Sequence, residues 1–406
     1  MKDIKPLFGL PVIVAALGYF VDIYDLLLFS IVRIPSLQSM GVAPEALLDE
    51  GEFLLQVQMT GLLVGGVIWG IMGDKRGRLS VLFGSILMYS LANIANGFAT
   101  NVDQYAILRF VAGIGLAGEL GAGITLVSEV LPTRLRGYGT ALVATVGLFG
   151  AVLANFVAKH FDWQTTYFIG GGLGLALLIA RASVFESGLF VKVKESAVER
   201  GNFFMLFTNS ARLKRFIGCI LIGLPIWYVI GILITFSPEF ARELGVDGDI
   251  IAGDAVMYSY LALTVGDFAS GFISQMVKSR KKIVLIFIFL TLGAIIFYLF
   301  LPIKTVVFFY IACGILGFSI GYWALFVTIA AEQFGTNLRS TVATTVPNFI
   351  RGTVVPITLG FKYLRGEMGI IYAALIVGII TIIIALIALR SIDETYSRDM
   401  NYLEED

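Results

Sequence analysis

Long apolar runs separated by short polar stretches dominate this chain. Twelve of the runs contain roughly 20 residues each, which is the length of a helix that crosses a bilayer. They lie near 8–32, 54–72, 80–98, 105–130, 138–158, 164–181, 216–237, 254–276, 283–301, 305–331, 341–361 and 369–389. The long polar stretch at 182–215 separates six runs from six. We therefore expect an N-terminal six-helix bundle over 1–181, a linker over 182–215 and a C-terminal six-helix bundle over 216–406.

The lysines and arginines divide unevenly between alternate loops. If both termini are cytoplasmic, the cytoplasmic segments hold 21 of the 29 basic residues and the outer loops hold six. The remaining two, Arg109 and Arg351, lie inside helices. An excess of Lys and Arg on the cytoplasmic side is the positive-inside rule. The pattern predicts cytoplasmic termini and a bacterial-type inner membrane.

The composition supports the bilayer as the solvent, because 58% of the 406 residues are hydrophobic and only 14% are charged. Basic and acidic side chains number 29 each, so no charge excess favours a nucleic-acid partner. Cys219 and Cys313 both lie in apolar runs, which argues against a disulfide framework. The first run carries Asp22 and Asp25 and has no small-residue cleavage site, so we expect a retained membrane helix rather than a signal peptide.

Two segments recur at about half the chain length. The segment from Glu129 to Arg136, EVLPTRLR, returns 203 residues later as EQFGTNLR from Glu332 to Arg339. The loop that begins at Gly70 has a counterpart 201 residues further on, again with Gly-x-x-x-polar followed by basic residues. Self-similarity at this period indicates that one structural unit is used twice. Because both loops fall on the same membrane face, the halves repeat in parallel.

The repeated polar segments are candidates for a gate at the cytoplasmic face. An acidic residue at the end of a membrane helix, with an arginine seven residues later, is able to form an ion pair that closes one side of the protein. Plain anchoring of the loops is the alternative. The expected gate residues are Gly70, Asp74, Gly77, Arg78, Glu129, Arg136, Glu332 and Arg339.

Two motifs carry a family resemblance over essentially the whole chain. Residues 70–78, GIMGDKRGR, resemble the loop 2–3 signature G-x-x-x-D-[RK]-x-G-[RK] of the major facilitator superfamily. Residues 109–121, RFVAGIGLAGELG, are similar to helix 4 of its metabolite:proton symporters, which carry aromatic acids, dicarboxylates, proline or betaine. Tyr24 and Asp25 also resemble the sugar porters. However, the GLPIWY run from Gly223 lacks their paired glutamines, and Gly188 replaces their proline.

The resemblance implies an all-α integral membrane protein with twelve helices, arranged as two parallel-repeat six-helix bundles around a central cavity. In that fold, helices 3, 6, 9 and 12 face lipid, and helices 1, 4, 8 and 11 border the cavity. Charges inside the membrane cost about 2.5–3.5 kcal/mol each on insertion scales and so indicate functional sites. Six such charges lie well inside helices, all of them in the cavity-bordering set: Asp22, Asp25, Arg109, Glu119, Asp267 and Arg351.

Asp25 and Arg109 lie at similar depths in helices 1 and 4. The resemblance assigns a matching pair in sugar porters to proton coupling. Protonation of Asp25 would free Arg109 and bias one access state over the other. A permanent ion pair that locks the two helices is the alternative. Asp22, one turn from Asp25, would share its proton or form a polar cavity wall. Asp267 is a further candidate for proton coupling.

Glu119 and Arg351 are the candidates for substrate binding. Glu119 lies near the midplane, where it would accept a proton, hold a cationic group, pair with Arg351, or serve only as a buried acid. Arg351 is central in helix 11, and a guanidinium in a cavity is suited to clamp a carboxylate. A helix-to-helix salt bridge with Asp267 or Glu119 is its alternative. The aromatic residues Trp227, Tyr228, Tyr322 and Trp323 would stack on an apolar or aromatic substrate, unless they only pack.

Other signals point away from enzymes and cofactors. The glycines at 113, 115 and 118 match a dinucleotide fingerprint literally, but they lie inside a membrane helix, where close helix packing explains them better. No phosphate-binding loop occurs. The sole histidine, His160, has no Cys or His nearby, which argues against metal or triad chemistry. We therefore expect no cofactor, no catalytic residues and no nucleic-acid partner.

The sequence thus favours a monomeric, proton-coupled importer of a small organic anion or zwitterion that works by alternating access. Its partners would be the substrate, protons and the bilayer. A sugar or polyol porter, or an exporter of amphiphilic compounds, is the alternative in the same class. A transporter-shaped sensor that binds without transport, or a membrane enzyme, has less support from the residues.

Overall fold

The computed structural model describes residues 5–76, 78–119, 131, 135–186, 203–302, 304–396 and 404. The first half contains α1 (Leu10–Ser39), α2 (Leu47–Arg76), α3 (Arg78–Asn96), α4 (Val102–Leu116), α6 (Arg136–His160) and α7 (Trp163–Glu186), with short 3-10 turns η1 (Lys5–Phe8) and η2 (Pro44–Ala46). The second half contains α8 (Met205–Thr208), α9 (Ser210–Ile222), α10 (Leu224–Tyr228), the π-helical turn η4 (Val229–Ile234), α11 (Ser237–Leu244), α12 (Ala252–Val277), α13 (Arg280–Leu299), α14 (Val306–Ser319), α15 (Trp323–Glu332), α16 (Thr336–Gly352) and α17 (Val354–Ser391).

Apart from the short helices α8 and α11, the described α-helices overlap the predicted apolar segments, which confirms an all-α membrane protein. Among the described residues, nine helical stretches are long and apolar enough to cross a bilayer. The last of these, Asn337–Ser391, has 55 residues and would be about 80 Å long as one helix, far more than a bilayer needs. It turns at Gly369, whose φ of 81° lies in the left-handed region that favours glycine. The predicted helices 11 and 12 therefore meet at this residue.

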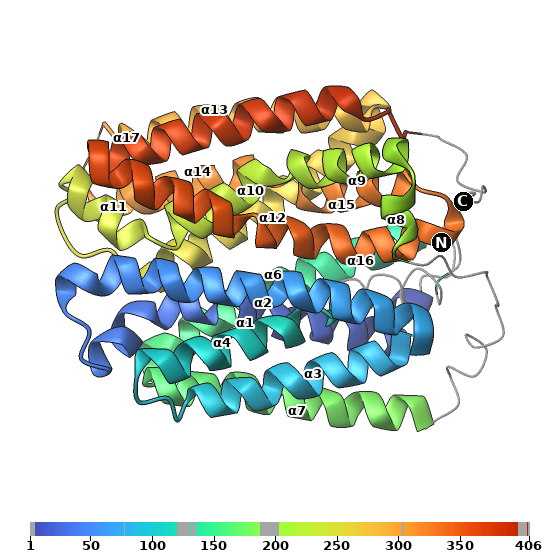
Figure 1. Ribbon diagram of the computed structural model, residues 1–406, viewed down its shortest axis with the longest axis horizontal. Coiled ribbons are helices and arrows are strands. Elements are labelled where there is room, and N and C mark those ends of the chain that lie inside the picture. The colour runs from blue at the N-terminus through green and yellow to red at the C-terminus, as the bar shows by residue number, and fades with distance from the viewer. Residues whose placement is uncertain are drawn as a thin grey trace.

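The helices run roughly side by side in two groups (Figure 1). The helices before α8, drawn from blue to green, form the lower group, and those from α8 onward form the upper group. The beginning of α1 and the end of α17 lie at the same end of the bundle, which we call the terminal end. The opposite end, where α1 ends and α12 begins, we call the far end.

The repeat seen in the sequence recurs in the packing of each half. A Cβ added at Gly113 of α4 would lie 2.3 Å from the carbonyl oxygen of Gln58 on α2. A Cβ added at Gly317 of α14 would lie 2.0 Å from the carbonyl oxygen of Ser259 on α12. The two pairs are related by steps of 204 and 201 residues along the chain. Each half is thus built on a glycine-mediated contact of the same kind, as expected for helices that pack closely in a membrane.

Two of the spanning segments are interrupted near their middle. The segment that follows α8 is divided into α9, α10 and the π-helical turn η4, and Pro225 lies in the first turn of α10. The segment at 306–332 is divided into α14 and α15 around Tyr322. Prolines and π-turns are ordinary causes of such breaks. Both breaks adjoin the centre of the bundle, where they direct Trp227 and Trp323 toward the other half.

Candidate functional site

A small cavity lies between the two halves at the centre of the bundle. Its volume of about 20 Å³ has room for about one water molecule. Both halves line it: Tyr19, Ile23, Leu26 and Leu148 from the first, and Ile226, Trp227, Ile230, Tyr260, Leu263, Trp323 and Arg351 from the second. The aromatic and aliphatic side chains make the cavity mostly apolar. In this conformation little space is therefore left between the two halves at this position.

Arg351 supplies the positive charge at this cavity. Its side chain is 1% exposed, and its Cζ lies 5.5 Å from the ring centroid of Trp227 and 5.8 Å from that of Trp323. These distances are within the range of cation–π attraction. Nη1 donates to the side-chain oxygen of Asn348 at 3.5 Å, whereas Nε of Arg351 and Nε1 of Trp227 have no acceptor in the described part of the chain. Both unpartnered donors are buried, and both residues line the same apolar cavity.

Asp22 is the acidic group nearest to Arg351 among the described residues. Nη2 of Arg351 lies 3.9 Å from Oδ2 of Asp22, so this contact joins α1 in the first half to α16 in the second. The Asp22 side chain is fully buried, and neither of its carboxylate oxygens accepts a hydrogen bond from a described residue. The contact is longer than a direct charge-assisted hydrogen bond. Arg351 is therefore only loosely compensated, and the salt bridges with Asp267 or Glu119 left open by the sequence are not formed.

Arg109 is held by asparagines rather than by a direct ion pair with Asp25. Its Nη2 donates to Asn93 at 2.6 Å and its Nε to Asn96 at 3.2 Å, both on α3. Its Cζ also lies 4.8 Å from the ring centroid of Tyr167 on α7. The carboxylate oxygens of Asp25 accept no hydrogen bond within the described chain. Asp25 and Arg109 are both fully buried in the first half, away from the central cavity.

Glu119 pairs with Arg181, a residue that the sequence analysis placed at the end of helix 6. Arg181 Nη1 donates to Oε2 of Glu119 at 2.9 Å, and Nη2 also bonds to Oε1. The pair is 1–2% exposed and lies against Gly18 of α1, where a Cβ would fall 2.0 Å from Nη2 of Arg181. The expectation that the charges inside the membrane lie only in helices 1, 4, 8 and 11 is wrong for Arg181, because α7 continues to Glu186. Glu119 is thus neutralised within the first half and does not line the central cavity.

Asp267 stabilises the break between α14 and α15. Its Oδ1 accepts a hydrogen bond from the backbone N–H of Ala324 at 3.0 Å, in the first turn of α15. A carboxylate at a helix N-terminus satisfies an otherwise unpaired donor and is favoured by the helix dipole. Its other oxygen, Oδ2, is buried without a partner in the described chain. Asp267 therefore anchors the first turn of α15, which begins at Trp323.

The two predicted tyrosines lie beside the cavity residues but point elsewhere. Tyr228 donates to the carbonyl of Ala374 on α17 at 2.6 Å. Tyr322 donates to the carbonyl of Ile222 on α9 at 3.2 Å. Both hydroxyls therefore join helices within the second half. The aromatic residues that do line the cavity include Tyr19 and Tyr260, which the sequence analysis did not single out, because aromatic residues recur on every face of these helices.

Ion pairs join the two halves at the far end. They are Arg33 with Glu239 (2.6 Å), Arg365 with Asp49 (2.9 Å) and Glu52 (3.4 Å), Lys362 with Asp49 (2.9 Å), and Lys159 with Asp254 (2.5 Å). We call these the far-end pairs. The sequence analysis treated these residues as loop charges because the partners are more than 90 residues apart. Only the fold brings them together, and their arrangement closes the far end.

At the terminal end, the predicted gate is described in part. Gly70 of α2 faces Thr345 of α16, with 3.4 Å between an added Cβ and Cγ2. Glu332 pairs with Arg280 at 2.7 Å within the second half, and Arg339 donates to the carbonyl of Phe334 at 3.4 Å. The structure describes the backbone of Asp74, Arg78 and Arg136, in α2, α3 and α6, but not their side chains. Gly77 and Glu129 lie outside the described residues altogether. Their gating role remains a prediction.

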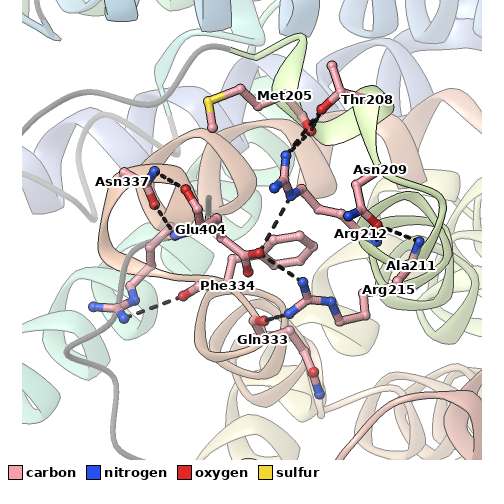
Figure 2. A network of polar contacts seen from close by, with 11 residues as sticks. Met205, Thr208, Asn209, Ala211, Arg212, Arg215, Gln333, Phe334, Asn337 and Glu404 are labelled. Carbon is pink, nitrogen blue, oxygen red and sulfur yellow. Dashed lines mark hydrogen bonds and ion pairs between the residues drawn. The ribbon is translucent and has the colours of Figure 1, made fainter. Parts of the chain in front are cut away.

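A further polar network joins the terminal ends of α8, α9 and α16 (Figure 2). The carboxylate of Glu404 lies 3.5 Å from Nε of Arg212 and 3.0 Å from Nη2 of Arg215. Asn337 contacts the Glu404 backbone twice, donating to its carbonyl and accepting from its N–H, each at 3.0 Å. Arg212 also donates to the carbonyl of Met205 at 2.6 Å. Arg212 therefore contacts both Glu404 and Met205, and Met205 lies at the start of the second half.

Glu394 ties the segment after α17 to the start of α13. Its carboxylate accepts hydrogen bonds from the Ser279 hydroxyl and from the backbone N–H groups of Arg280 and Lys281. Burial alone would raise the pKa of Glu394, but these hydrogen bonds and one from the N–H of Tyr396 outweigh it and hold the pKa below its usual range. The ionised carboxylate thus completes the N-terminal cap of α13.

Proteins similar to the chain include several bacterial transporters. It is 26% identical to a probable 4-methylmuconolactone transporter of Cupriavidus pinatubonensis, over 80% of this chain and 76% of the relative. It is 30% identical to a niacin transporter of Acinetobacter baylyi over 43% of this chain, although that match spans only 40% of the relative. It is 29% identical to a 3-(3-hydroxy-phenyl)propionate transporter of Escherichia coli over 52% of this chain and 53% of the relative.

The family model agrees with these relatives and with the helical bundle. The model described as the Major Facilitator Superfamily matches residues 15–352, which include most of α1, the residues that line the central cavity, and Arg351. The match covers well over half of the chain and both of its halves. This chain is therefore a membrane transporter that belongs to the Major Facilitator Superfamily.

Proposed function

We propose that the protein imports a small aromatic carboxylate together with protons, by alternating access. The observation that carries this proposal is the pair of unpartnered donors beside the cavity, Nε of Arg351 and Nε1 of Trp227. A buried donor without an acceptor is costly, and a substrate carboxylate would satisfy both groups. The rings of Trp227 and Trp323, 6.2 Å apart and inclined at 73°, offer apolar faces to an aromatic ring.

The names of the relatives support this substrate class. Niacin and 3-(3-hydroxyphenyl)propionate each combine an aromatic ring with a carboxylate. A site for such a molecule needs one cation and several apolar surfaces, which is the composition of the central cavity. Because the present cavity has room for about one water molecule, the halves must separate before a substrate enters.

For the route of the proton we propose Asp22 and Asp25. Burying an ionised carboxylate without hydrogen-bond donors is costly, whereas burying the protonated acid is less so. Both side chains are fully buried and lack donors in the described chain. Asp22 faces Arg351, so its ionised form would compete with the substrate carboxylate for the same guanidinium. Protonation of Asp22 would then accompany substrate binding, and Asp25 with Arg109 would transmit the proton within the first half.

The orientation and the direction of transport belong to the same proposal. The excess of Lys and Arg in the loops at the terminal end supports placing that end in the cytoplasm of a bacterial cell. The far-end pairs would then close the outer side in the conformation described here. Substrate would enter after they separate and leave between the terminal ends of the halves.

Tryptophan fluorescence of the purified protein tests substrate binding. Titration with benzoate should perturb the emission of Trp227 and Trp323, whereas benzamide, which lacks the charge, should not. Arg351→Gln should weaken benzoate binding roughly ten- to hundredfold, because a hydrogen bond to a charged group contributes about 1.5–3 kcal/mol. Arg242→Gln removes an exposed arginine of α11, outside both the cavity and the far-end pairs, and is the matched control, with benzoate affinity expected to change little. Unaltered benzoate binding in Arg351→Gln would contradict the proposal that Arg351 binds the substrate carboxylate.

A further inference from the structure

A second, larger furrow lies on the surface of the second half, between α9 and α17. Its volume is about 320 Å³, and its walls are formed by Lys214, Ile217, Gly218, Leu221, Ile384, Ile387, Ala388 and Ser391. It shares no residue with the central cavity. The furrow ends near the terminal end, where α9 begins and α17 finishes.

The furrow arises where small residues separate larger apolar ones. Gly218 and Ala388 form its floor, and Ile217 and Ile387 project beside it with 44% and 63% of their surfaces exposed. A Cβ at Gly218 would meet Cγ2 of Ile392 at 3.1 Å, so the floor is already in contact with α17 and the segment that follows it. Because both helices cross the membrane, the exposed isoleucines face the bilayer. Acyl chains are the material available to fill the furrow there.

Lys214 is the one charged residue among those that line the furrow, and it lies at the polar end. Three basic residues occupy the first turns of α9, and two of them, Arg212 and Arg215, bind Glu404 on the side shown in Figure 2. Lys214 lies between them in sequence but lines the furrow instead. Its side chain is exposed, and no carboxylate of the described residues lies within 4.0 Å of its ammonium group. A lysine that pairs with none of the described carboxylates thus lies near the start of α9, at the terminal end.

We propose that this furrow binds a phospholipid with an anionic headgroup, with an acyl chain along Gly218 and Ala388 and the phosphate at Lys214. Apolar contact alone does not discriminate among lipids, because every acyl chain is equally apolar. Selectivity therefore comes from Lys214, since a basic residue near an anionic surface contributes about 1 kcal/mol. An acidic peptide would match the charge but would leave the furrow unfilled. The proposal does not depend on which substrate is transported.

Native mass spectrometry of the detergent-purified protein measures this preference. We expect phosphatidylglycerol to bind about fivefold more tightly than phosphatidylcholine with the same acyl chains. Lys214→Ala should abolish the preference, because it weakens phosphatidylglycerol more than phosphatidylcholine, whose choline cation already offsets the charge of its phosphate. Lys282→Ala removes another exposed lysine at the terminal end, outside the furrow, and should retain the full preference. Melting temperatures of both variants, expected to equal that of the wild type, show that each is folded.

Two further experiments test whether the lipid binds in the furrow itself or is attracted only by the surface charge. Ala388→Phe should fill the floor and weaken both lipids together, because it blocks the acyl chain. Soluble glycerol phosphate has the headgroup without the chains and should not displace phosphatidylglycerol. A preference that survives Lys214→Ala, or that Lys282→Ala removes equally, would overturn the proposal. Displacement by glycerol phosphate at concentrations equal to the lipid would overturn it as well, since the furrow would then be unnecessary.

Discussion

Nη2 of Arg351 and Oδ2 of Asp22 lie 3.9 Å apart, although one belongs to the second half of the chain and the other to the first. Both side chains are buried, and the distance exceeds that of a direct charge-assisted hydrogen bond. A substrate carboxylate and the Asp22 carboxylate would therefore be alternative partners for one guanidinium. Binding of a substrate in the cavity would therefore be linked to the protonation of Asp22 in α1.

Asp22→Asn should make benzoate binding insensitive to pH. In the wild type, ionised Asp22 competes with the substrate for Arg351, so benzoate affinity should rise as the pH is lowered and Asp22 takes up a proton. The asparagine carries no charge and cannot compete, so its affinity should stay constant as the pH changes. Fluorescence titration at several pH values measures the difference.

Asp25→Asn is the matched control, because it removes the neighbouring carboxylate, which does not face Arg351. Its benzoate affinity should keep the wild-type pH dependence. In proteoliposomes, exchange of labelled benzoate should persist, while accumulation driven by a pH gradient should be lost. A wild-type pH profile in Asp22→Asn would contradict the competition, and full accumulation in Asp25→Asn would contradict its part in coupling.

Glu239→Gln should favour opening of the far end. Arg33 is fully buried, donates to both carboxylate oxygens of Glu239 at 2.6 and 2.8 Å, and would be left as an unpaired buried cation in the closed state. A cysteine introduced at Leu26, which lines the central cavity, should then react at least about tenfold faster with an impermeant maleimide added at the far end. The exchange Arg33→Glu/Glu239→Arg should restore slow labelling.

Lys362→Gln provides the comparison for an exposed far-end pair. Lys362 and Asp49 are 48% and 49% exposed, and such pairs contribute about 0.2–1 kcal/mol. The labelling rate at position 26 should therefore change by less than about fivefold. Equal labelling in Glu239→Gln and the wild type would show that the Arg33–Glu239 pair does not hold the far end closed.

Glu119→Gln should lower stability rather than substrate affinity. Removing one partner of a buried ion pair costs about 3–5 kcal/mol, because Arg181 would remain buried without its carboxylate. The melting temperature should fall, and the double variant Glu119→Gln/Arg181→Gln should recover much of the loss. Benzoate affinity should stay within about twofold of the wild type, since the pair does not line the cavity. Lost binding in a fully stable Glu119→Gln would instead support the substrate role suggested by the sequence.

Glu394→Gln should destabilise the protein near neutral pH but not in acid. A carboxylate whose folded-state pKa is lowered contributes stability above its unfolded pKa of about 4.3, and that contribution is lost as the pH falls through the folded value. At about pH 7 the variant should lose roughly 0.5–1 kcal/mol, which is typical of a helix cap. In acid the difference between the two melting temperatures should shrink as the pH falls through the folded-state pKa. Glu367→Gln is the control, because Glu367 is an exposed acid near the turn at Gly369. Its melting temperature should equal that of the wild type at every pH.

The hydrophobic pattern predicted the fold well, because crossing a bilayer requires long apolar helices and leaves few alternatives. The parallel repeat was also visible in the sequence, and the matching contacts of Gly113 and Gly317 confirm it. Arg351 was identifiable as a central residue because a charge in the middle of a membrane helix needs a compensating function. Such constraints act along a single helix, so the sequence shows them directly.

Contacts between helices were harder to predict. Arg181 was missed because the apolar run ends there, whereas α7 continues and buries it beside Glu119. Tyr19 and Tyr260 carry no signal that distinguishes a cavity wall from a packing face. The partners of Arg109 are neutral asparagines on α3, a helix without internal charges, so a search for opposite charges passed over them. Pairing across helices depends on rotation and depth, which the hydrophobic pattern does not determine.

The far-end pairs differ in how they respond to the surrounding electrolyte. The Lys362–Asp49 pair is half exposed, and dissolved salt screens such charges over a Debye length of about 8 Å at physiological ionic strength. The Arg33–Glu239 pair is nearly enclosed and is largely shielded from dissolved ions. Added salt should thus weaken the Lys362–Asp49 contact and leave the Arg33–Glu239 contact nearly unchanged.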